Sequence, residues 1–104
     1  MNSYSVHELR SAFDAIGLSD GDTVLIQSSL ADLGIMKDVP LPKFVEAFYD
    51  EIRQCVGAMG TVAASTFSMA STRGETFDPG LTPSDNGVLS EFIRNLPGAF
   101  RSPH

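Results

Sequence analysis

The residues of this chain that could carry out chemistry gather toward its C-terminal end. Arg101, Ser102 and His104 lie within four positions of one another, and Asp78 stands in a Phe-Asp-Pro sequence. An arginine can bind a phosphate through two hydrogen bonds, a serine hydroxyl can donate to a carbonyl or phosphate oxygen, and a histidine can move a proton near pH 7. The structural alternatives are a surface arginine, a terminal histidine without contacts, and an aspartate that caps or forms a turn before proline.

A second candidate site follows a short apolar run at residues 23–27. Ser28 and Ser29 come directly after this run, which is rich in residues that favour a strand. Where a strand turns into a helix, amide groups and hydroxyls point outward and can bind an anionic group such as phosphate. The same two serines can instead cap a helix without any ligand. The sequence carries none of the glycine-rich fingerprints of nucleotide-binding loops.

Hydrophobic periodicity predicts helices and strands that alternate along the chain. The first helix starts at a capping box formed by Ser5 and Glu8 and ends at Gly17. Its apolar stripe consists of Val6, Leu9, Phe13 and Ile16. The elements expected after it are a strand over 23–27, a helix over 42–56, a strand over 61–67 and a helix over 88–96. Residues 68–86 show no periodicity and are expected to form a functional loop, and residues 99–102 could open a third strand.

These elements point to an α/β fold. Both predicted strands are too continuously apolar for a half-exposed sheet, which is typical of buried parallel strands. The amphipathic helix between them then forms the crossover of a parallel pair. Two or three strands are too few to bury three helices, so we expect a three-layer α/β/α sheet with parallel strands that is incomplete at the C-terminus. Residues 1–104 would be the N-terminal part of a single domain.

Composition excludes several classes of function. The chain has 104 residues, enough for one small domain, and its formal net charge of −6 argues against a nucleic-acid partner. Its single cysteine, Cys55, falls on the apolar side of a predicted helix and is expected to fill the core, while His7 is expected to be a solvated helix residue. The sequence shows neither a signal-peptide pattern nor a membrane-spanning apolar run, so we expect a cytoplasmic protein without a membrane partner.

The order of short motifs in the second half of the chain adds a family to this interpretation. These motifs are Phe77-Asp78-Pro79, Thr82-Pro83, Gly87, Glu91, Arg94, Pro97-Gly98 and Arg101-Ser102-Pro103-His104. The series resembles that of the aminoglycoside 3-N-acetyltransferase family, which carries Phe-Asp-Pro, Thr-Pro, Gly, Glu, Arg, Pro-Gly and Arg-Ser-x-His in this order. The resemblance extends over nearly all of the chain from Asp20 onward.

The resemblance implies an N-acetyltransferase that uses acetyl-coenzyme A as co-substrate and a small-molecule amine, an aminoglycoside or related aminosugar, as acceptor. Antibiotic resistance or aminosugar biosynthesis would be its biological setting. By the same resemblance Ser28, Ser29 and Leu30 contact coenzyme A, and Arg101 and Ser102 lie beside it. His104 and Asp78 are then the catalytic candidates. Glu91 and Arg94 are taken as a structural pair, because they stand three residues apart on a helix.

Family members carry their principal catalytic histidine and acidic residues beyond the Arg-Ser-x-His segment. We therefore expect the chain to be the N-terminal portion of a longer enzyme, inactive in isolation. The alternative is a truncated, non-catalytic relative that binds coenzyme A or acts as an α/β interaction domain without a ligand.

Two positions depart from the family pattern. Gln27 stands where a histidine is usual before the two serines, and Ser65 stands where proline is common after the second strand. Glutamine donates and accepts hydrogen bonds but does not titrate near neutrality, which argues against proton transfer by the side chain at this position.

Overall fold

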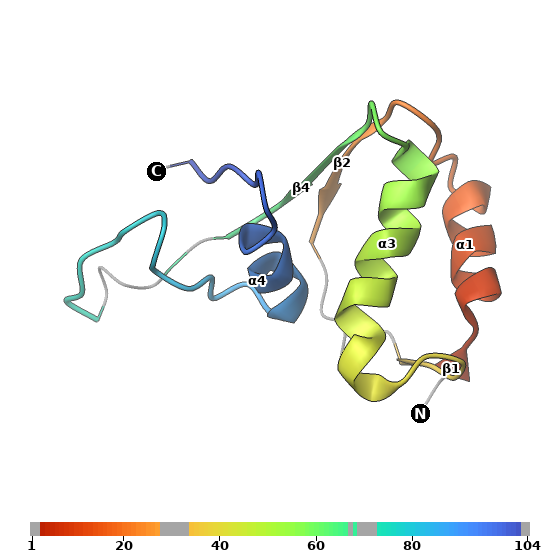
Figure 1. The fold of residues 1–104 in the computed structure, drawn as a ribbon, viewed down its shortest axis with the longest axis horizontal. Helices are drawn as coiled ribbons and strands as arrows, with labels where there is room; N and C mark the ends of the chain where they lie inside the picture. Colours follow the sequence, from red (N-terminus) through yellow and green to blue (C-terminus); the bar gives the residue numbers. More distant parts are fainter. Residues whose placement is uncertain (1–2, 28–33, 67, 69–72, 103–104) are drawn as a thin grey trace.

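Helices and short strands alternate along the chain, as the periodicity predicts (Figure 1). The computed structural model describes residues 3–27, 34–66, 68 and 73–102. The elements are β1 (Ser3–Tyr4), α1 (Val6–Ala15), β2 (Thr23–Ile26), β3 (Ile35–Met36), a 3-10 turn η1 (Leu41–Lys43), α3 (Phe44–Val56), β4 (Thr61–Ala64) and α4 (Val88–Arg94).

The central strands β2 and β4 lie side by side and run parallel, with Thr23 opposite Thr61 and Ile26 opposite Ala64. The helix α3 connects them, so the predicted parallel pair with its helical crossover is confirmed. A second parallel pair joins β1 to β3. The sequence did not predict this pair, because strands of two residues are too short to show any periodicity.

One apolar cluster holds the helices against the β2–β4 sheet. Phe48 of α3 lies at its centre, edge-to-face with Phe13 at 5.9 Å between ring centroids and stacked on Phe44 at 6.5 Å. Val6, Leu9 and Phe13 of the predicted α1 stripe pack against this cluster. Ile16, the last residue of the predicted stripe, does not pack against the cluster and is 78% exposed. It follows the last residue of α1 and no longer lies on the buried face of the helix.

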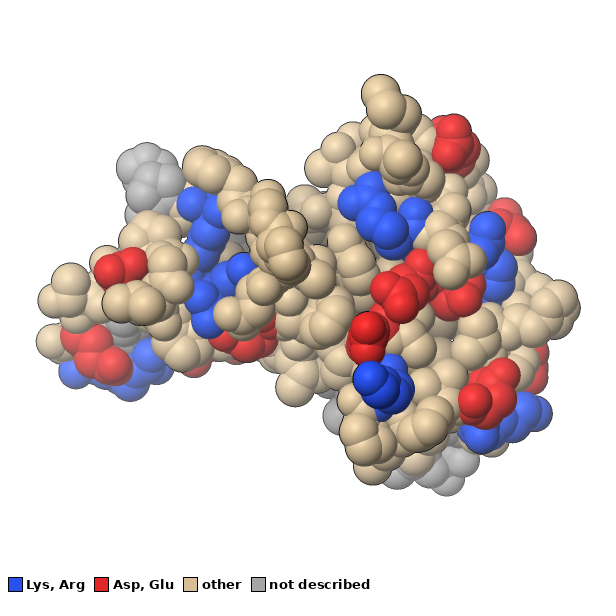
Figure 2. All heavy atoms as spheres, viewed as in Figure 1, with Lys and Arg blue, Asp and Glu red and all other residues tan. Residues whose placement is uncertain are grey.

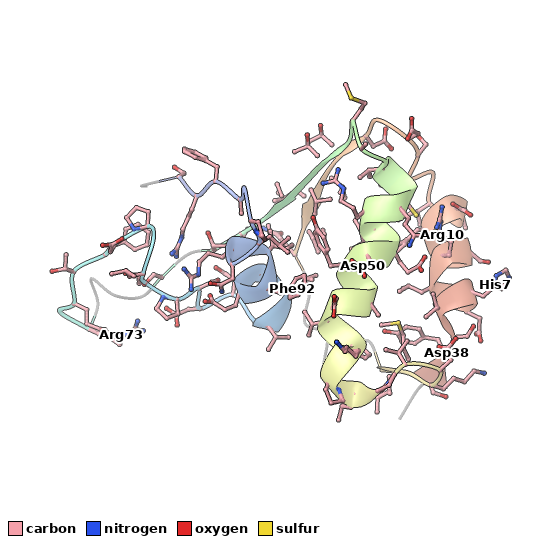
Figure 3. All side chains as sticks on the ribbon, in the orientation of Figure 1. His7, Arg10, Asp38, Asp50, Arg73 and Phe92 are labelled. Carbon is pink, nitrogen blue, oxygen red and sulfur yellow. The ribbon has the colours of Figure 1, made fainter. Side chains whose placement is uncertain are left out.

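The ends of the helices are fixed by specific polar contacts. The predicted capping box is confirmed: the Ser5 hydroxyl accepts from the amide of Glu8, whose carboxylate in turn accepts from the Ser5 amide. A further cap comes from Asp38, whose carboxylate accepts from the Val6 amide at 3.1 and 3.3 Å (Figure 3). At the other end, Gly57 terminates α3 with a φ of 73°, a conformation that a residue with a Cβ rarely adopts.

The helical layer lies on one face of the β2–β4 sheet. Figure 1 shows α1 and α3 side by side, with α4 beside the other end of the sheet, and α4 contacts both α3 and β4. Side chains alternate along a strand, so Val24 and Ile26 of β2 reach the core while Leu25 points to the opposite face, where it is 62% exposed. The described residues thus form an α/β unit with parallel strands and one helical layer.

The expected third strand at residues 99–102 is wrong. These residues form neither helix nor strand: within the part of the chain that the structure describes, they border a groove beside the unpaired edge of β4 but form no ladder with it.

Candidate functional site

A groove runs along the edge of β4 that does not pair with β2. It has a volume of about 930 Å³ and is bordered by α3, the end of α4 and residues 97–102. In Figure 2 the outline of the molecule narrows between the part built on α1 and α3 and the part built on α4 and the long loop before it. The charged side chains among the described lining residues are all cationic: Arg53, Arg94 and Arg101. Arg94 is paired with Glu91. Among the described residues Arg53 and Arg101 donate only to carbonyl oxygens, so these two make the groove a local site of positive charge in a chain of net charge −6.

Arg101 lines the groove and contacts four other residues of the chain. Its guanidinium donates to the carbonyl oxygens of Thr66 at 2.6 Å, Pro79 at 3.3 Å and Thr82, and it lies 4.7 Å from the centre of the Phe77 ring. Within the described residues its buried Nε has no hydrogen-bond partner. Arg101 thus joins the end of β4 to the loop that carries the Phe-Asp-Pro motif.

That loop is folded around Asp78. The Asp78 carboxylate accepts from the Gly80 amide at 2.8 Å, and its carbonyl accepts from the amides of Leu81 and Thr82 at 3.1 and 2.8 Å. The Thr82 hydroxyl accepts from the Asp78 amide at 2.7 Å. These contacts are those of an aspartate that forms a turn, one of the readings that the sequence left open.

Glu91 and Arg94 of α4 pair with each other, in accord with the structural role expected for them. Glu91 also accepts from the Ser84 amide at 2.7 Å, and Arg94 donates to the Gly80 carbonyl at 3.3 Å. The hydrogen bond from Arg94, helped by that from Ser84, lowers the pKa of Glu91 from its usual 4.5 to about 2 against the opposing effect of burial. The pair therefore attaches the loop to α4 next to the point that Arg101 holds, since Arg94 and Arg101 bind the adjacent carbonyls of Gly80 and Pro79.

The structure brings together some of the residues predicted to form the site. Arg101 and Ser102 both line the groove, as does Phe77. Asp78 lies next to this lining but is itself exposed and does not belong to it. The predicted residues Ser28, Ser29, Leu30 and His104 lie outside the described residues.

Other residues match or extend the sequence analysis. Cys55 is buried, and that burial raises the pKa of its thiol, as suits a core side chain; His7 is exposed on α1 and points away from the molecule (Figure 3).

The sequence did not single out Arg53. This residue donates to the carbonyls of Gly57 at 2.9 Å and of Gly60, which places its charge at the start of β4. A cation in the last turn of a helix, close to a glycine pair, is the signal that could have indicated it.

Residues 3–27, 34–66, 68 and 73–102 contain no cluster of histidine, cysteine and acidic residues able to hold a metal ion. Over the same residues no helix is both long and apolar enough to cross a bilayer.

The fold and groove define a parallel α/β unit with a cationic cleft at its strand edge, and comparison with known proteins gives it a family. Residues 25–104 match the model of the family described as aminoglycoside 3-N-acetyltransferase. The chain therefore belongs to the aminoglycoside 3-N-acetyltransferase family.

Two curated relatives are similar over most of the chain. Aminoglycoside N(3)-acetyltransferase VIII of Streptomyces fradiae is 30% identical over 88% of this chain and 37% of its own length. Aminoglycoside N(3)-acetyltransferase VII of Streptomyces paromomycinus is 32% identical over 86% of this chain and 36% of its own length. The chain thus spans little more than a third of each of these relatives.

Solved structures of similar fold include complexes. A binary complex of AAC-IIIb with CoASH is 26% identical, with a TM-score of 0.68 over 93% of this chain and 41% of that one. A mutant of aminoglycoside acetyltransferase AAC(3)-IVa in complex with apramycin is 27% identical, with a TM-score of 0.76 over 100% of this chain and 41% of that one.

Proposed function

We propose that this chain is part of an N-acetyltransferase that transfers the acetyl group of acetyl-coenzyme A to an amino group of an aminoglycoside or related aminosugar. The observation that carries the proposal is the family match over residues 25–104, together with relatives named for this activity. Resistance to an aminoglycoside is the expected consequence for the cell, and a cytoplasmic location is part of the same proposal.

The groove supports this function by its size and charge. Ligand sites commonly enclose about 300–1,000 Å³, and the groove of about 930 Å³ falls within that range. Coenzyme A is long and carries several phosphate charges, which Arg53 and Arg101 favour electrostatically, since neither is paired with a carboxylate among the described residues. The guanidinium groups of Arg53, Arg94 and Arg101 already donate to internal acceptors. We therefore expect the arginines to act on coenzyme A mainly through the electrostatic potential of the groove rather than through direct hydrogen bonds.

The residues keep the roles that the resemblance implies. Ser28, Ser29 and Leu30 follow the end of β2 and would contact coenzyme A, as would Arg101 and Ser102 in the groove. Asp78 and His104 would act on the proton of the acceptor amine. In the described loop the Asp78 carboxylate is exposed, with one oxygen accepting from the Gly80 amide, and it is thus open to an approaching cation.

The reaction requires an uncharged amine, since a protonated one has no electron pair. The amine nitrogen attacks the thioester carbonyl carbon, the carbon–sulfur bond breaks, and sulfur leaves as the thiolate of coenzyme A, which then takes up the proton that the nitrogen has lost to the base. A general base takes the proton that the nitrogen loses, and hydrogen-bond donors stabilise the charge that forms on the carbonyl oxygen.

The fold belongs to the proposal as well. Leu25 is 62% exposed on the sheet face opposite the helices, and among the described residues β2 pairs with no strand other than β4. We infer that in the active protein further parallel strands extend this sheet beyond β2, which leaves the groove beside β4 open, and that helices cover the Leu25 face, which gives the three-layer arrangement expected from the sequence.

Calorimetric titration with coenzyme A tests the proposal. We expect the wild-type chain to bind it, and the double variant Ser28→Ala, Ser29→Ala to bind more weakly by about 1–3 kcal/mol, because hydrogen bonds to charged groups are lost. Ser3→Ala, on β1 far along the chain from these serines, is the control and should bind like the wild type. Absence of binding by the wild type would refute the proposal, and equal affinity of the double variant would assign both serines to capping.

A thiol-release assay with acetyl-coenzyme A and a panel of aminoglycosides then tests catalysis. We expect no acceptor-dependent release from the 104-residue chain alone. Turnover that is lost in His104→Ala, but retained in His7→Ala, would instead assign the base to His104.

A further inference from the structure

A second, smaller pocket lies at the carboxyl ends of β2 and β4, beside the start of α4. Its volume is about 260 Å³, and its lining consists of Ile26, Gln27, Ala64, Ser65, Asn86, Leu89 and Ser90. We refer to it as the Gln27–Ser65 pocket. Ligands of open α/β sheets bind outside the carboxyl ends of the strands, so its position is that of a binding site rather than of a packing defect.

The chemistry of the lining restricts what this pocket can hold. Its polar side chains are amides and hydroxyls, and its described lining contains neither a carboxylate nor a cation. An ammonium group would lack a counter-charge there, and a phosphate would lack an arginine or lysine. The charged amines of an acceptor and the phosphates of a nucleotide are therefore both disfavoured, and an uncharged polar group is favoured.

The hydrogen-bonding capacity of the pocket specifies that group further. Gln27 Nε2 donates to Ser65 Oγ at 3.2 Å, which holds the two side chains together across the strand ends. The side-chain oxygen of Gln27, Oε1, accepts no hydrogen bond within the described residues. The Ser65 hydroxyl still has its proton to donate. The pair thus presents one acceptor and one donor, which is the complement of the N–H and C=O of a secondary amide.

The remaining walls suit what flanks such an amide. Ser90 is buried, and its hydroxyl is already bonded to the Gly87 carbonyl at 2.9 Å and to Ser84 at 3.0 Å, so it supports the wall rather than binding a ligand. Ile26, Ala64 and Leu89 provide apolar surface on which methylene groups can pack.

We propose that the Gln27–Ser65 pocket binds an amide of the pantetheine arm of acetyl-coenzyme A. This inference rests on the proposed function and adds to it a subsite. Gln27 and Ser65 are the two positions at which the sequence departs from the family pattern, and the structure shows them bonded to each other. A proline at position 65 has no side-chain hydroxyl, so the donor of this subsite depends on the residue present here.

The side-chain amide signal of Gln27 in proton–nitrogen correlation NMR reports on this pocket directly. We expect it to shift when the 104-residue chain is titrated with coenzyme A. It should not shift with adenosine bisphosphate, the half of coenzyme A that lacks the pantetheine arm, or with an aminoglycoside.

Matched variants supply the second measurement. Gln27→Met keeps the length of the side chain and Ser65→Ala keeps the backbone, but each removes one partner of the amide. We expect each variant to weaken coenzyme A binding about three- to tenfold, the effect of one lost hydrogen bond. Gln54→Met is the control, because Gln54 bonds to Arg10 on the far side of α3 and should leave the affinity unchanged.

The outcomes separate this inference from the function on which it rests. Binding of coenzyme A without a shift at Gln27, or with unchanged affinity in both variants, overturns the subsite and leaves the proposed function standing. A shift caused by adenosine bisphosphate or by an aminoglycoside also overturns it. Absence of coenzyme A binding refutes the proposed function, and free pantetheine then decides the pocket: a saturable Gln27 shift retains it as an amide site, and no shift rejects it.

Discussion

The two parts of this molecule are held together by different forces. In the part built on α1, α3, β2 and β4, the rings of Phe13 and Phe44 pack against Phe48 and the buried residues are almost all apolar. In the loop of residues 73–87, which has no regular structure before α4, arginine side chains bind the backbone carbonyls instead. Figure 3 shows the contrast, with Arg10 between the packed helices and Arg73 at the far tip of the loop.

This difference separates scaffold from site. Apolar packing is cooperative and makes the helices and the sheet rigid, whereas a loop held by a few polar side chains can open locally without unfolding the rest. The groove lies between the two parts, with β4 on one side and residues 97–102 on the other. A rigid strand edge beside an adjustable loop is a common arrangement for a binding site.

The largest effect is expected in the packed part. Phe48→Ala leaves a cavity at the centre of the core and should lower the free energy of unfolding by about 3–5 kcal/mol. Phe100→Ala is the matched control, since Phe100 is 90% exposed and its loss should cost less than about 0.5 kcal/mol. Denaturant unfolding followed by circular dichroism measures both. Similar losses for the two variants would show that the packed part is not the stable one.

A smaller and local effect is expected in the loop. Arg101→Lys keeps the charge but loses the planar fork that reaches Thr66, Pro79 and Thr82. The loop should then open more easily by about 1–2 kcal/mol, so that its amides exchange with deuterium about 5- to 30-fold faster. Exchange in α3 should stay unchanged.

Arg73→Lys is the control for this second prediction, because Arg73 pairs with Glu75 and Asp85 at the exposed tip of the loop. Equal exchange rates in the two variants would mean that Arg101 does not hold the loop. Its guanidinium would then be free to bind a phosphate, as the sequence suggested.

The packed part was largely predictable from the sequence. The spacing of Val6, Leu9 and Phe13, and the apolar runs that became β2 and β4, follow the periods of a helix and a strand, and the structure has them within a few residues of the expected bounds. The prediction that Ile16 belongs to the buried stripe was wrong, because hydrophobic periodicity does not show at which residue a helix ends.

The site was much less predictable. A hydrogen bond such as that from Gln27 to Ser65 joins residues 38 positions apart, and no local pattern encodes it. The three carbonyls bound by Arg101 are likewise invisible in sequence, since every residue has a carbonyl. Motif order indicated that Arg101 and Ser102 belong together with the Asp78 loop, but the groove and the contribution of Arg53 to it needed the fold.

The smallest expected effect concerns Glu91, through which the loop is attached to α4. Its pKa in the folded protein is about 2, below the usual 4.5, so the folded state favours the ionised carboxylate. The stabilisation is therefore complete above pH 4.5 and is lost as the pH falls toward 2. Glu91→Gln removes the ion pair with Arg94 and should cost about 1 kcal/mol near neutral pH, as for a partly exposed pair. The difference from the wild type should shrink only in that acidic window.

Glu46→Gln makes the same charge change in an exposed pair with Lys43, at 3.7 Å on α3, and should cost less at every pH. Thermal unfolding of the three proteins from pH 2 to 7 measures this, and a Glu91→Gln cost that did not change with pH would contradict an ionised Glu91 as the link between loop and helix.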